Sequence, residues 1–268
     1  LIAIDIDGTL VNSRGQLTPK VKETIKQATA QGIKVVICTG RPLAGVTELL
    51  AQLDLADQDD QYVVCFGGAV VETTSGKLIF KKGISYDDFV DLEAIARKLN
   101  LHFQAINTER IYTCNKDIGY YTLYEANLVS MPISYRTPEE MREISLVKAM
   151  YIEDAEILDP AIAKQEYFEP IKDRLDLMKT APFYYEANAK DVNKGNALVK
   201  LCEILDLTAD NVMAIGDEEN DISMLKFAGT SVAMGNAVPA VKEVATHHTV
   251  DNDHDGVAQA IRELALKK

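Results

Sequence analysis

Short apolar runs and amphipathic stretches alternate along the first third of the chain. The apolar runs, at 1–4, 33–38 and 62–66, have the length and continuity of buried strands. The stretches that begin at Pro19 and Pro42 repeat apolar residues every three to four positions, and proline is favoured at the first position of a helix. Strands that alternate with helices predict a parallel sheet with helices on its faces.

The pattern changes near residue 83 and changes back near residue 189. Within 83–188 the predicted strands are longer, alternating and aromatic, which indicates an α+β region with an antiparallel sheet. From Asn193 onward, strand and helix alternate again. We therefore predict an α/β protein. Residues 1–82 and 189–268 form a Rossmann-like, three-layer α/β/α core with a parallel sheet, which an α+β domain at 83–188 interrupts.

Composition sets the broad class. The chain has 268 residues, of which 47% are hydrophobic and 26% are charged. Both fractions are typical of a globular protein with a sizeable core. Lys and Arg total 28 against 41 Asp and Glu, so the formal net charge is 28 − 41 = −13. Such acidity argues against a nucleic-acid partner, which needs a basic face, but it leaves room for a local site that binds a small anion.

The cysteines and the hydropathy of the chain indicate its compartment. The four cysteines are far apart and form no CxxC pair, so we interpret them as small buried hydrophobes in a reducing compartment. No apolar run is long enough to span a membrane, and the chain opens on a strand-like run instead of a basic signal segment. We expect a cytoplasmic protein without a membrane partner, either a monomer or a small homo-oligomer.

The strongest local motif follows the first predicted strand. It reads Asp5-Ile6-Asp7-Gly8-Thr9. Carboxylates two residues apart point the same way on an extended chain, and the end of a parallel strand is where open α/β sheets bind ligands. Two adjacent carboxylates attract a cation, and oxygen ligands suit Mg²⁺. For such a pair by itself, a solvated acidic turn is the commoner explanation.

Three further motifs follow predicted strands or open a predicted helix. In Thr39-Gly40-Arg41-Pro42, a hydroxyl, a glycine and a helix start come together, which is an anion-binding arrangement. Asn193-Lys194-Gly195 places a lysine at a helix start, where the helix dipole disfavours it. Gly216-Asp217-Glu218-Glu219-Asn220-Asp221 places an aspartate at a strand end, with polar residues in the next turn.

Taken in this order, the four motifs resemble those of the haloacid dehalogenase-like (HAD) phosphatase superfamily. The position and size of the insert resemble the class IIB cap of Cof-type phosphatases. Shorter phrases are similar to the YidA-type sugar phosphatases, and the likeness covers essentially the whole chain. These phrases are Arg41-Pro42-Leu43-Ala44-Gly45, Tyr120-Tyr121-Thr122, Val192-Asn193-Lys194-Gly195 and Met213-Ala214-Ile215-Gly216-Asp217.

The resemblance implies a role for each motif residue. Asp5 is the nucleophile that forms an aspartyl-phosphate, and Asp7 is the general acid and then the general base. The Asp5 carboxylate, the Asp7 backbone carbonyl and Asp217 hold Mg²⁺. Further groups contact the phosphoryl oxygens or support the ligands from behind. The phosphoryl contacts are Thr39, Lys194 and the amides of Ile6 and Gly40. Asn220 and Asp221 either support the ligands from behind or touch the phosphate, with Asn220 counted among the substrate-binding residues.

Several functional alternatives stay open. The first expectation is a Mg²⁺-dependent phosphatase acting on small phosphate monoesters, with sugar phosphates foremost. A phosphohexomutase would use the same aspartyl-phosphate but return the phosphate to the sugar. A catalytically silent phosphate-binding regulator is the third. Release of inorganic phosphate without an isomer removes the mutase, and turnover of a generic aryl phosphate removes the silent regulator.

Substrate choice is expected to lie in the insert, because the core motifs supply no slot for a leaving group. The candidates are His102, Tyr120, Tyr121, Tyr124 and Tyr184, for which packing within the insert is the commoner role. Arg41 either reaches phosphate or faces solvent or the cap. His247 and His248 are interpreted as part of a strand edge.

One departure from the subgroup lies after the third strand. Gly67-Gly68-Ala69 stands where the subgroup usually has Asn-Gly-Ala. We expect the extra glycine to loosen the turn and to leave the four motifs untouched.

Overall fold

The computed structural model describes residues 1–266 of the chain, which form two compact units. The first unit comprises Leu1–Phe80 and the chain from Asn193 onward, and the second comprises Lys81–Val192. The sequence analysis placed the second boundary at 188/189. It lies later because strand β11 (Tyr184–Ala189) pairs through Ala189 with its neighbour in the second unit.

The first unit contains an eight-stranded sheet with the order β14-β13-β12-β1-β2-β3-β4-β5. The pairs from β14 to β3 are parallel, and β3 pairs with β4 in the antiparallel direction. The strands are β1 (Ile2–Ile4), β2 (Val35–Cys38), β3 (Tyr62–Cys65), β4 (Val70–Thr73), β5 (Leu78–Lys81), β12 (Met213–Gly216), β13 (Thr230–Ala233) and β14 (His247–His248). The exposed edge strand β14 holds the two histidines, as the sequence predicted.

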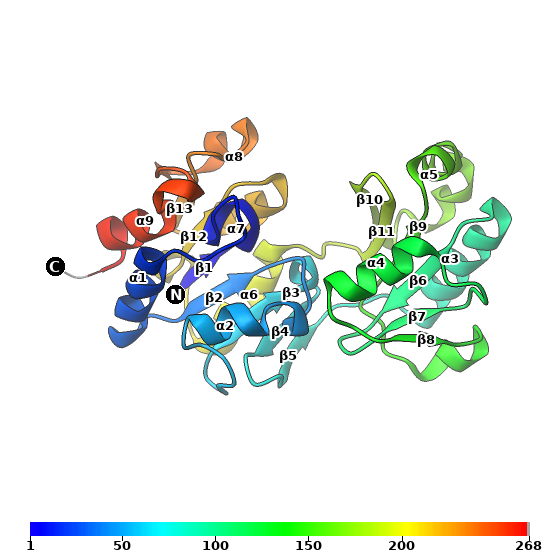
Figure 1. The fold of residues 1–268 in the computed structure, drawn as a ribbon, viewed down its shortest axis with the longest axis horizontal. Helices are drawn as coiled ribbons and strands as arrows, with labels where there is room; N and C mark the ends of the chain where they lie inside the picture. The colour runs from blue at the N-terminus through cyan, green and yellow to red at the C-terminus, as the bar shows by residue number, and fades with distance from the viewer. Residues whose placement is uncertain (267–268) are drawn as a thin grey trace. The chain divides into compact units, whose positions relative to one another are not determined.

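Helices cover this sheet. Crossovers between parallel strands are right-handed. The connections β1–α1–β2 and β2–α2–β3 therefore place α1 and α2 on one face of the sheet. The connections β12–α7–β13 and β13–α8–β14 run across the sheet in the opposite direction and place α7 and α8 on the other face. Figure 1 shows α1 and α9 side by side, and α6, α7 and α8 pack in succession. The helices are α1 (Pro19–Ala30), α2 (Thr47–Gln52), α6 (Lys194–Leu205), α7 (Ile222–Phe227), α8 (Pro239–Val244) and α9 (Gly256–Leu264).

Local sequence signals explain where these elements begin. Thr18 caps α1, its hydroxyl accepting a hydrogen bond from the Val21 amide, and Pro19 occupies the first helical position. The helix predicted to begin at Pro42 begins later, because residues 43–45 form a tighter turn before α2.

The central strands β12, β1 and β2 are neighbours and are fully buried. Ile2 pairs with Met213 on one side and with Val35 on the other, so the three strands end at nearly the same level. All four cysteines are free, and Cys38 and Cys65 are buried in β2 and β3. The residues that follow these strand ends therefore lie together at one edge of a rigid sheet.

The second unit contains a six-stranded sheet with the order β10-β11-β9-β6-β7-β8. Its strands are β6 (Phe103–Ile106), β7 (Ile111–Thr113), β8 (Ile133–Tyr135), β9 (Lys148–Ile152), β10 (Leu175–Ala181) and β11 (Tyr184–Ala189). Its helices are α3 (Tyr86–Leu99), α4 (Tyr120–Leu128) and α5 (Ala155–Ile162). An apolar core rich in aromatic side chains packs one face of the sheet against α3.

The prediction of a wholly antiparallel sheet for this unit was wrong at β8, which pairs with β7 in the parallel direction. Helix α4 connects the two strands, and such a crossover gives parallel neighbours. The sequence analysis did not predict α4, because its polar and apolar residues occupy the opposite positions to those of an ordinary amphipathic helix. Thr122 and Glu125 are buried, whereas Tyr120 and Leu123 are exposed.

The Gly67-Gly68 turn has two glycines with different roles. Gly67 has a φ of +65° and open space around its missing Cβ, and its amide donates to the Thr39 carbonyl. Gly68 has a φ of +107°, and a Cβ there would lie 2.2 Å from the Asn193 carbonyl oxygen. Asparagine adopts the left-handed conformation of residue 67 readily, which accounts for the asparagine that the subgroup usually has there.

We expect Gly68→Ala to lower the free energy of unfolding by about 3 kcal/mol, because a clash with backbone adds to the unfavourable φ. The matched control Gly67→Asn should change it by less than about 0.5 kcal/mol. Urea unfolding of the three proteins measures both effects. Equal stability of Gly68→Ala and the wild type would show that the turn and the start of α6 are not in this close contact.

Candidate active site

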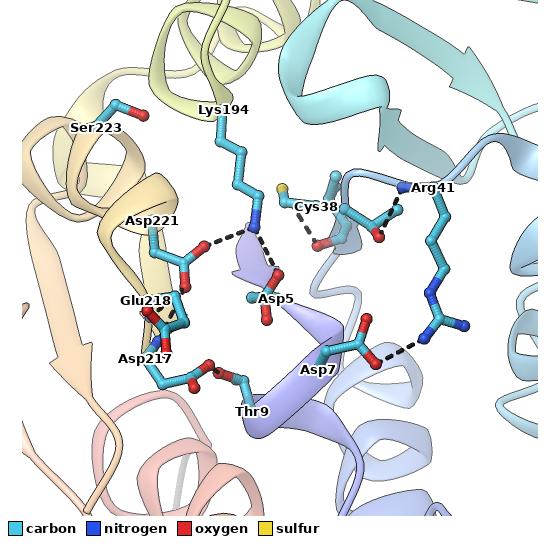
Figure 2. Close-up of polar contacts among 12 residues, drawn as sticks. Asp5, Asp7, Thr9, Cys38, Arg41, Lys194, Asp217, Glu218, Asp221 and Ser223 are labelled. Carbon is cyan, nitrogen blue, oxygen red and sulfur yellow. Dashed lines mark hydrogen bonds and ion pairs between the residues drawn. The ribbon is translucent and has the colours of Figure 1, made fainter. Parts of the chain in front are cut away.

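Four segments converge at the carboxyl edge of the core sheet. Asp5 follows β1, Thr39 follows β2, and Asp217 follows β12, while Lys194 is the first residue of α6. Figure 2 shows the lysine amino group pointing toward Asp5 and Asp221. Lys194 Nζ lies 2.5 Å from Asp5 Oδ1 and 2.6 Å from Asp221 Oδ1. Lys194 thus joins three of the four predicted motifs through direct contacts, and Arg41 of the remaining motif contacts Asp7.

Lys194 is one of the most buried charged side chains in residues 1–266, with 1% of its surface exposed. Asn193 caps the helix through the Asn196 amide, which fixes the direction in which the lysine leaves the backbone. Burial by itself would lower the pKa of Lys194, but Asp5 and Asp221 outweigh it and raise the pKa above the usual lysine range. The lysine is therefore a permanent cation at this site.

Asp5, Asp217 and Asp221 form a buried carboxylate cluster whose oxygens lie within 4.8 Å of one another. Burial raises the pKa of Asp5 to about 7, and burial likewise raises the pKa of Asp217 to about 6. Three carboxylates face one ammonium, so the ionised cluster carries an excess of negative charge. An additional cation would relieve this excess.

The oxygen atoms of the cluster fit a hard divalent cation. Asp221 is fully engaged, because Oδ1 accepts from Lys194 and Oδ2 accepts from the amides of Asp217 and Glu218. Asp5 accepts from Lys194 through Oδ1, and Asp217 accepts one hydrogen bond at each oxygen, so both carboxylates accept fewer hydrogen bonds than Asp221. An all-oxygen donor set with these two carboxylates suits Mg²⁺. Asp5 and Asp217, the two carboxylates predicted to hold the metal, thus lie together with Asp221 in one oxygen-rich cluster.

The loop after β1 is held close to Asp217. Thr9 Oγ1 donates a 2.5 Å hydrogen bond to Asp217 Oδ1. Gly8 has a φ of +85°, and a Cβ at this position would lie 2.2 Å from Asp217 Oδ2. The glycine and threonine of the first motif therefore let the loop after β1, Ile6–Leu10, approach the carboxylate of the fourth.

Asn236, which the sequence analysis missed, joins the same two segments. Its Nδ2 donates to the Gly8 carbonyl at 2.8 Å and to Asp217 Oδ2 at 3.3 Å, and its Oδ1 accepts from the Asn252 amide. The residue comes shortly after β13, so its position beyond a core strand was the available signal.

We expect Asn236→Ala to raise the Mg²⁺ concentration needed for half-maximal activity by about tenfold, because loss of an oriented partner of a metal ligand typically weakens binding 10–100-fold. The Mg²⁺-induced rise in melting temperature, measured on the same variant, should shrink in parallel. Asn12→Ala, which removes an amide side chain that bonds only within the following turn, is the control. An unchanged Mg²⁺ requirement would show that Asn236 does not orient Asp217.

Asp7 lies apart from the buried cluster and is paired with Arg41. Arg41 Nη2 donates to Asp7 Oδ1 at 2.6 Å, and both side chains are exposed (Figure 2). The sequence analysis left Arg41 between phosphate, solvent and the cap, and the structure adds a role that it did not consider. The ion pair links the second aspartate of the first motif to the second motif.

The remaining predicted residues differ in how the structure places them. Thr39 is buried, and its Oγ1 accepts from the Arg41 amide at 3.1 Å, which leaves the hydroxyl proton free to donate. Ile6 and Gly40 directly follow the first residues after β1 and β2, so their amides are at the site edge. Asn220 is exposed, and within residues 1–266 it has no hydrogen bond to the buried cluster.

The predicted specificity residues of the second unit have partners inside that unit. His102 Nδ1 lies 2.6 Å from Glu153 Oε2, Tyr121 donates to Asp154, and Tyr184 donates to buried Glu125. Tyr120 and Tyr124 remain exposed.

Across the described residues, the helices are too short or too polar to cross a membrane.

Comparisons with known proteins agree with this geometry. Residues 2–261 match the family model of the haloacid dehalogenase-like hydrolases. A protein of Streptococcus pyogenes is 44% identical over 99% of this chain and 98% of its own length. The 5-amino-6-(5-phospho-D-ribitylamino)uracil phosphatase YcsE of Bacillus subtilis is 33% identical over 99% of this chain and 96% of its own length.

Solved structures show the same fold. A haloacid dehalogenase-like hydrolase from Bacteroides thetaiotaomicron matches with a TM-score of 0.86 and 30% identity, covering 98% of each chain. The HAD subclass IIB sugar phosphatase BT4131 matches in fold with a TM-score of 0.77 and 23% identity, covering 98% of this chain and 97% of its own. From its family match and its relatives, the chain belongs to the haloacid dehalogenase-like hydrolase family, with the class IIB fold, and is a phosphoric monoester hydrolase.

Proposed function

We propose that the protein hydrolyses phosphate esters of small metabolites, sugar phosphates foremost, with Mg²⁺ and through an aspartyl-phosphate on Asp5. The observation that carries the proposal is the buried contact of Lys194 with Asp5 and Asp221 beside Asp217. This arrangement supports the proposal because a carboxylate that can act as a nucleophile, a fixed cation and further carboxylate oxygens that suit a hard divalent cation lie around one point. The relative YcsE, whose named substrate carries a phosphorylated polyol chain, supports the substrate class.

In the first step, an Asp5 carboxylate oxygen bonds to phosphorus and the bond from phosphorus to the ester oxygen breaks. Asp7, protonated, gives its proton to the departing alkoxide. In the second step, the Asp7 carboxylate takes a proton from water, and the water oxygen bonds to the phosphorus of the aspartyl-phosphate. The bond from Asp5 to phosphorus then breaks, which regenerates the carboxylate and releases inorganic phosphate.

The chain stabilises the charge that develops on the phosphoryl oxygens. Lys194 supplies a permanent cation, and the Thr39 hydroxyl and the amides of Ile6 and Gly40 supply oriented donors. Bound to the Asp5 and Asp217 carboxylates and the Asp7 carbonyl, Mg²⁺ would supply the charge that lets a carboxylate and a phosphate approach each other. Arg41 orients Asp7 for proton transfer.

The direct test measures inorganic phosphate released from ribose 5-phosphate, glucose 6-phosphate, sorbitol 6-phosphate and phenyl phosphate, with Mg²⁺ and with EDTA. The proposal expects Mg²⁺-dependent release without formation of an isomeric sugar phosphate. Isomer formation without release would establish the phosphohexomutase instead. Turnover of none of these esters would favour a silent phosphate-binding protein.

We also propose that the second unit is the cap that sets much of the substrate specificity. Its exposed tyrosines, Tyr120 and Tyr124, are available for this purpose, whereas Tyr184 is committed to Glu125. Ranking a panel of phosphate esters by kcat/KM for the wild type and for variants of the two exposed residues would measure this contribution.

A further inference from the structure

A cavity of about 210 Å³ lies within the first unit, directly beside Asp7. Its walls come from the loop after β1 on one side and from α2 with the turn before it on the other. The polar lining residues are Asp7, Arg41, Glu48 and Gln52. Asp5, Thr39 and Lys194 are not among its lining residues, whereas Ile6 is, so the cavity adjoins the place where the phosphoryl group would bind but does not contain it.

The helix α2 presents one side to this cavity. Its lining residues are Glu48, Leu49 and Gln52, whose spacing along the helix places them on one face. Gly45, in the turn before the helix, also lines the cavity. Within residues 1–266, neither Glu48 nor Gln52 has a hydrogen-bond or ion-pair partner. Two polar side chains are thus available to a ligand in the cavity.

The position of the cavity indicates which part of a substrate would enter it. A general acid gives its proton to the oxygen that leaves, so the group attached to that oxygen must lie next to Asp7. The cavity begins at Asp7 and extends away from the phosphoryl site. It is smaller than the roughly 300–1,000 Å³ of pockets that enclose a whole ligand, so it suits only a portion of a substrate.

The lining residues indicate the chemistry of that portion. Glu48 accepts hydrogen bonds, Gln52 both donates and accepts, and Arg41 retains donors beyond the one that it gives to Asp7. Hydroxyl groups, which donate and accept, match this set. A second anionic group would meet the carboxylates of Asp7 and Glu48, and an apolar group would desolvate them without compensation.

We infer that this cavity is a core-borne subsite for a hydroxyl-rich leaving group, with Glu48 and Gln52 as specificity-determining residues. The inference rests on the proposed function, since it needs Asp7 to act on the leaving oxygen. It also changes the expectation that the insert supplies all of the substrate selectivity, because part of the selectivity then belongs to α2.

The test compares Glu48→Ala/Gln52→Ala with the wild type on the best-hydrolysed ester of ribose 5-phosphate, glucose 6-phosphate and sorbitol 6-phosphate, and on phenyl phosphate. Two lost hydrogen bonds of about 1 kcal/mol each correspond to roughly a 30-fold loss of kcat/KM. We expect that loss for the sugar phosphate and less than about twofold for phenyl phosphate, which has no hydroxyl to bind.

A matched control and a blocking variant complete the design. Glu23→Ala/Gln27→Ala removes the same two residue types, four positions apart, from the exposed face of α1 and should change neither substrate. Gln52→Phe places an aromatic ring in the cavity and should raise KM for the sugar phosphate while sparing phenyl phosphate. Both α2 variants change exposed positions, so their circular-dichroism spectra and melting temperatures should match the wild type.

The outcomes separate the subsite from the proposed function. If the wild type hydrolyses both kinds of ester but the α2 variants lose activity equally on both, or on neither, the subsite is overturned while the phosphatase stands. If the wild type hydrolyses no ester, the proposed function fails. Calorimetric titration of the sugar phosphate into wild type and the double variant then decides the subsite, and equal affinities overturn it.

Discussion

Asp5→Asn is expected to lower the kcat for Mg²⁺-dependent hydrolysis by at least about 10³-fold while leaving the fold intact. The carboxamide has nearly the same shape as the carboxylate but cannot attack phosphorus, and it is a weaker metal ligand. Asp5 is buried with Lys194 Nζ 2.5 Å from its Oδ1, and the other two carboxylates of the cluster come from the segment after β12. Steady-state release of phosphate from phenyl phosphate measures the loss.

The same substitution is expected to preserve or raise the stability of the folded protein at high pH, although it lowers the activity. Burial raises the pKa of Asp5 to about 7, above the value near 3.8 that the unfolded chain has, so the folded protein binds more protons between these pH values. Stability then falls as pH rises through this window, and Asp5→Asn removes that loss. In EDTA at pH 8, the variant should melt at or above the temperature of the wild type. A variant that is both inactive and much less stable would show that Asp5 is structural.

Lys194→Met is expected to cause the largest loss of stability, about 3–5 kcal/mol in the absence of metal, together with loss of activity. Methionine fills a similar volume but removes the only cation that contacts Asp5 and Asp221 within the described residues. Removing one partner of a buried ion pair leaves uncompensated charge, which costs far more than an exposed pair.

Two conditions distinguish this electrostatic cause from a packing defect. The loss should be smaller at pH 5.5 than at pH 8, because the carboxylates of the variant can take up protons at the lower pH. Mg²⁺ should restore more stability to the variant than to the wild type. Urea unfolding at the two pH values, with EDTA or Mg²⁺, gives both comparisons. A loss that is independent of pH and Mg²⁺ would mean that Lys194 acts through packing.

The core could be predicted from sequence because its pattern is local and repetitive. The apolar runs that became β1 and β2 are buried on both faces, and a motif residue directly follows each. Strand order then places Asp5, Thr39 and Asp217 at one edge, so the site follows from topology as soon as the parallel sheet is assumed.

The parts that could not be predicted depend on long-range contacts. Asn236 meets Asp217 and Gly8 because β13 lies beside β12. Its position beyond a core strand was a signal for the site edge, but the two partners depend on a strand pairing that its neighbouring residues do not specify. Helix α4 buries Thr122 and Glu125 and exposes Tyr120, so the amphipathic pattern that predicts helices from sequence is absent there. The pairing of Arg41 with Asp7 is a choice of rotamer between two exposed side chains, which the sequence does not specify.

The central claim is that Asp5 carries the phosphoryl group between the two steps. The most direct measurement mixes Asp7→Asn with phenyl phosphate and Mg²⁺, quenches in acid and locates the added phosphoryl mass by peptide mass spectrometry. Without the Asp7 carboxylate to activate water, the intermediate should accumulate, and the account predicts the phosphoryl group on Asp5. A phosphoryl group on another residue, or none on Asp5 in samples that release phenol, would contradict it.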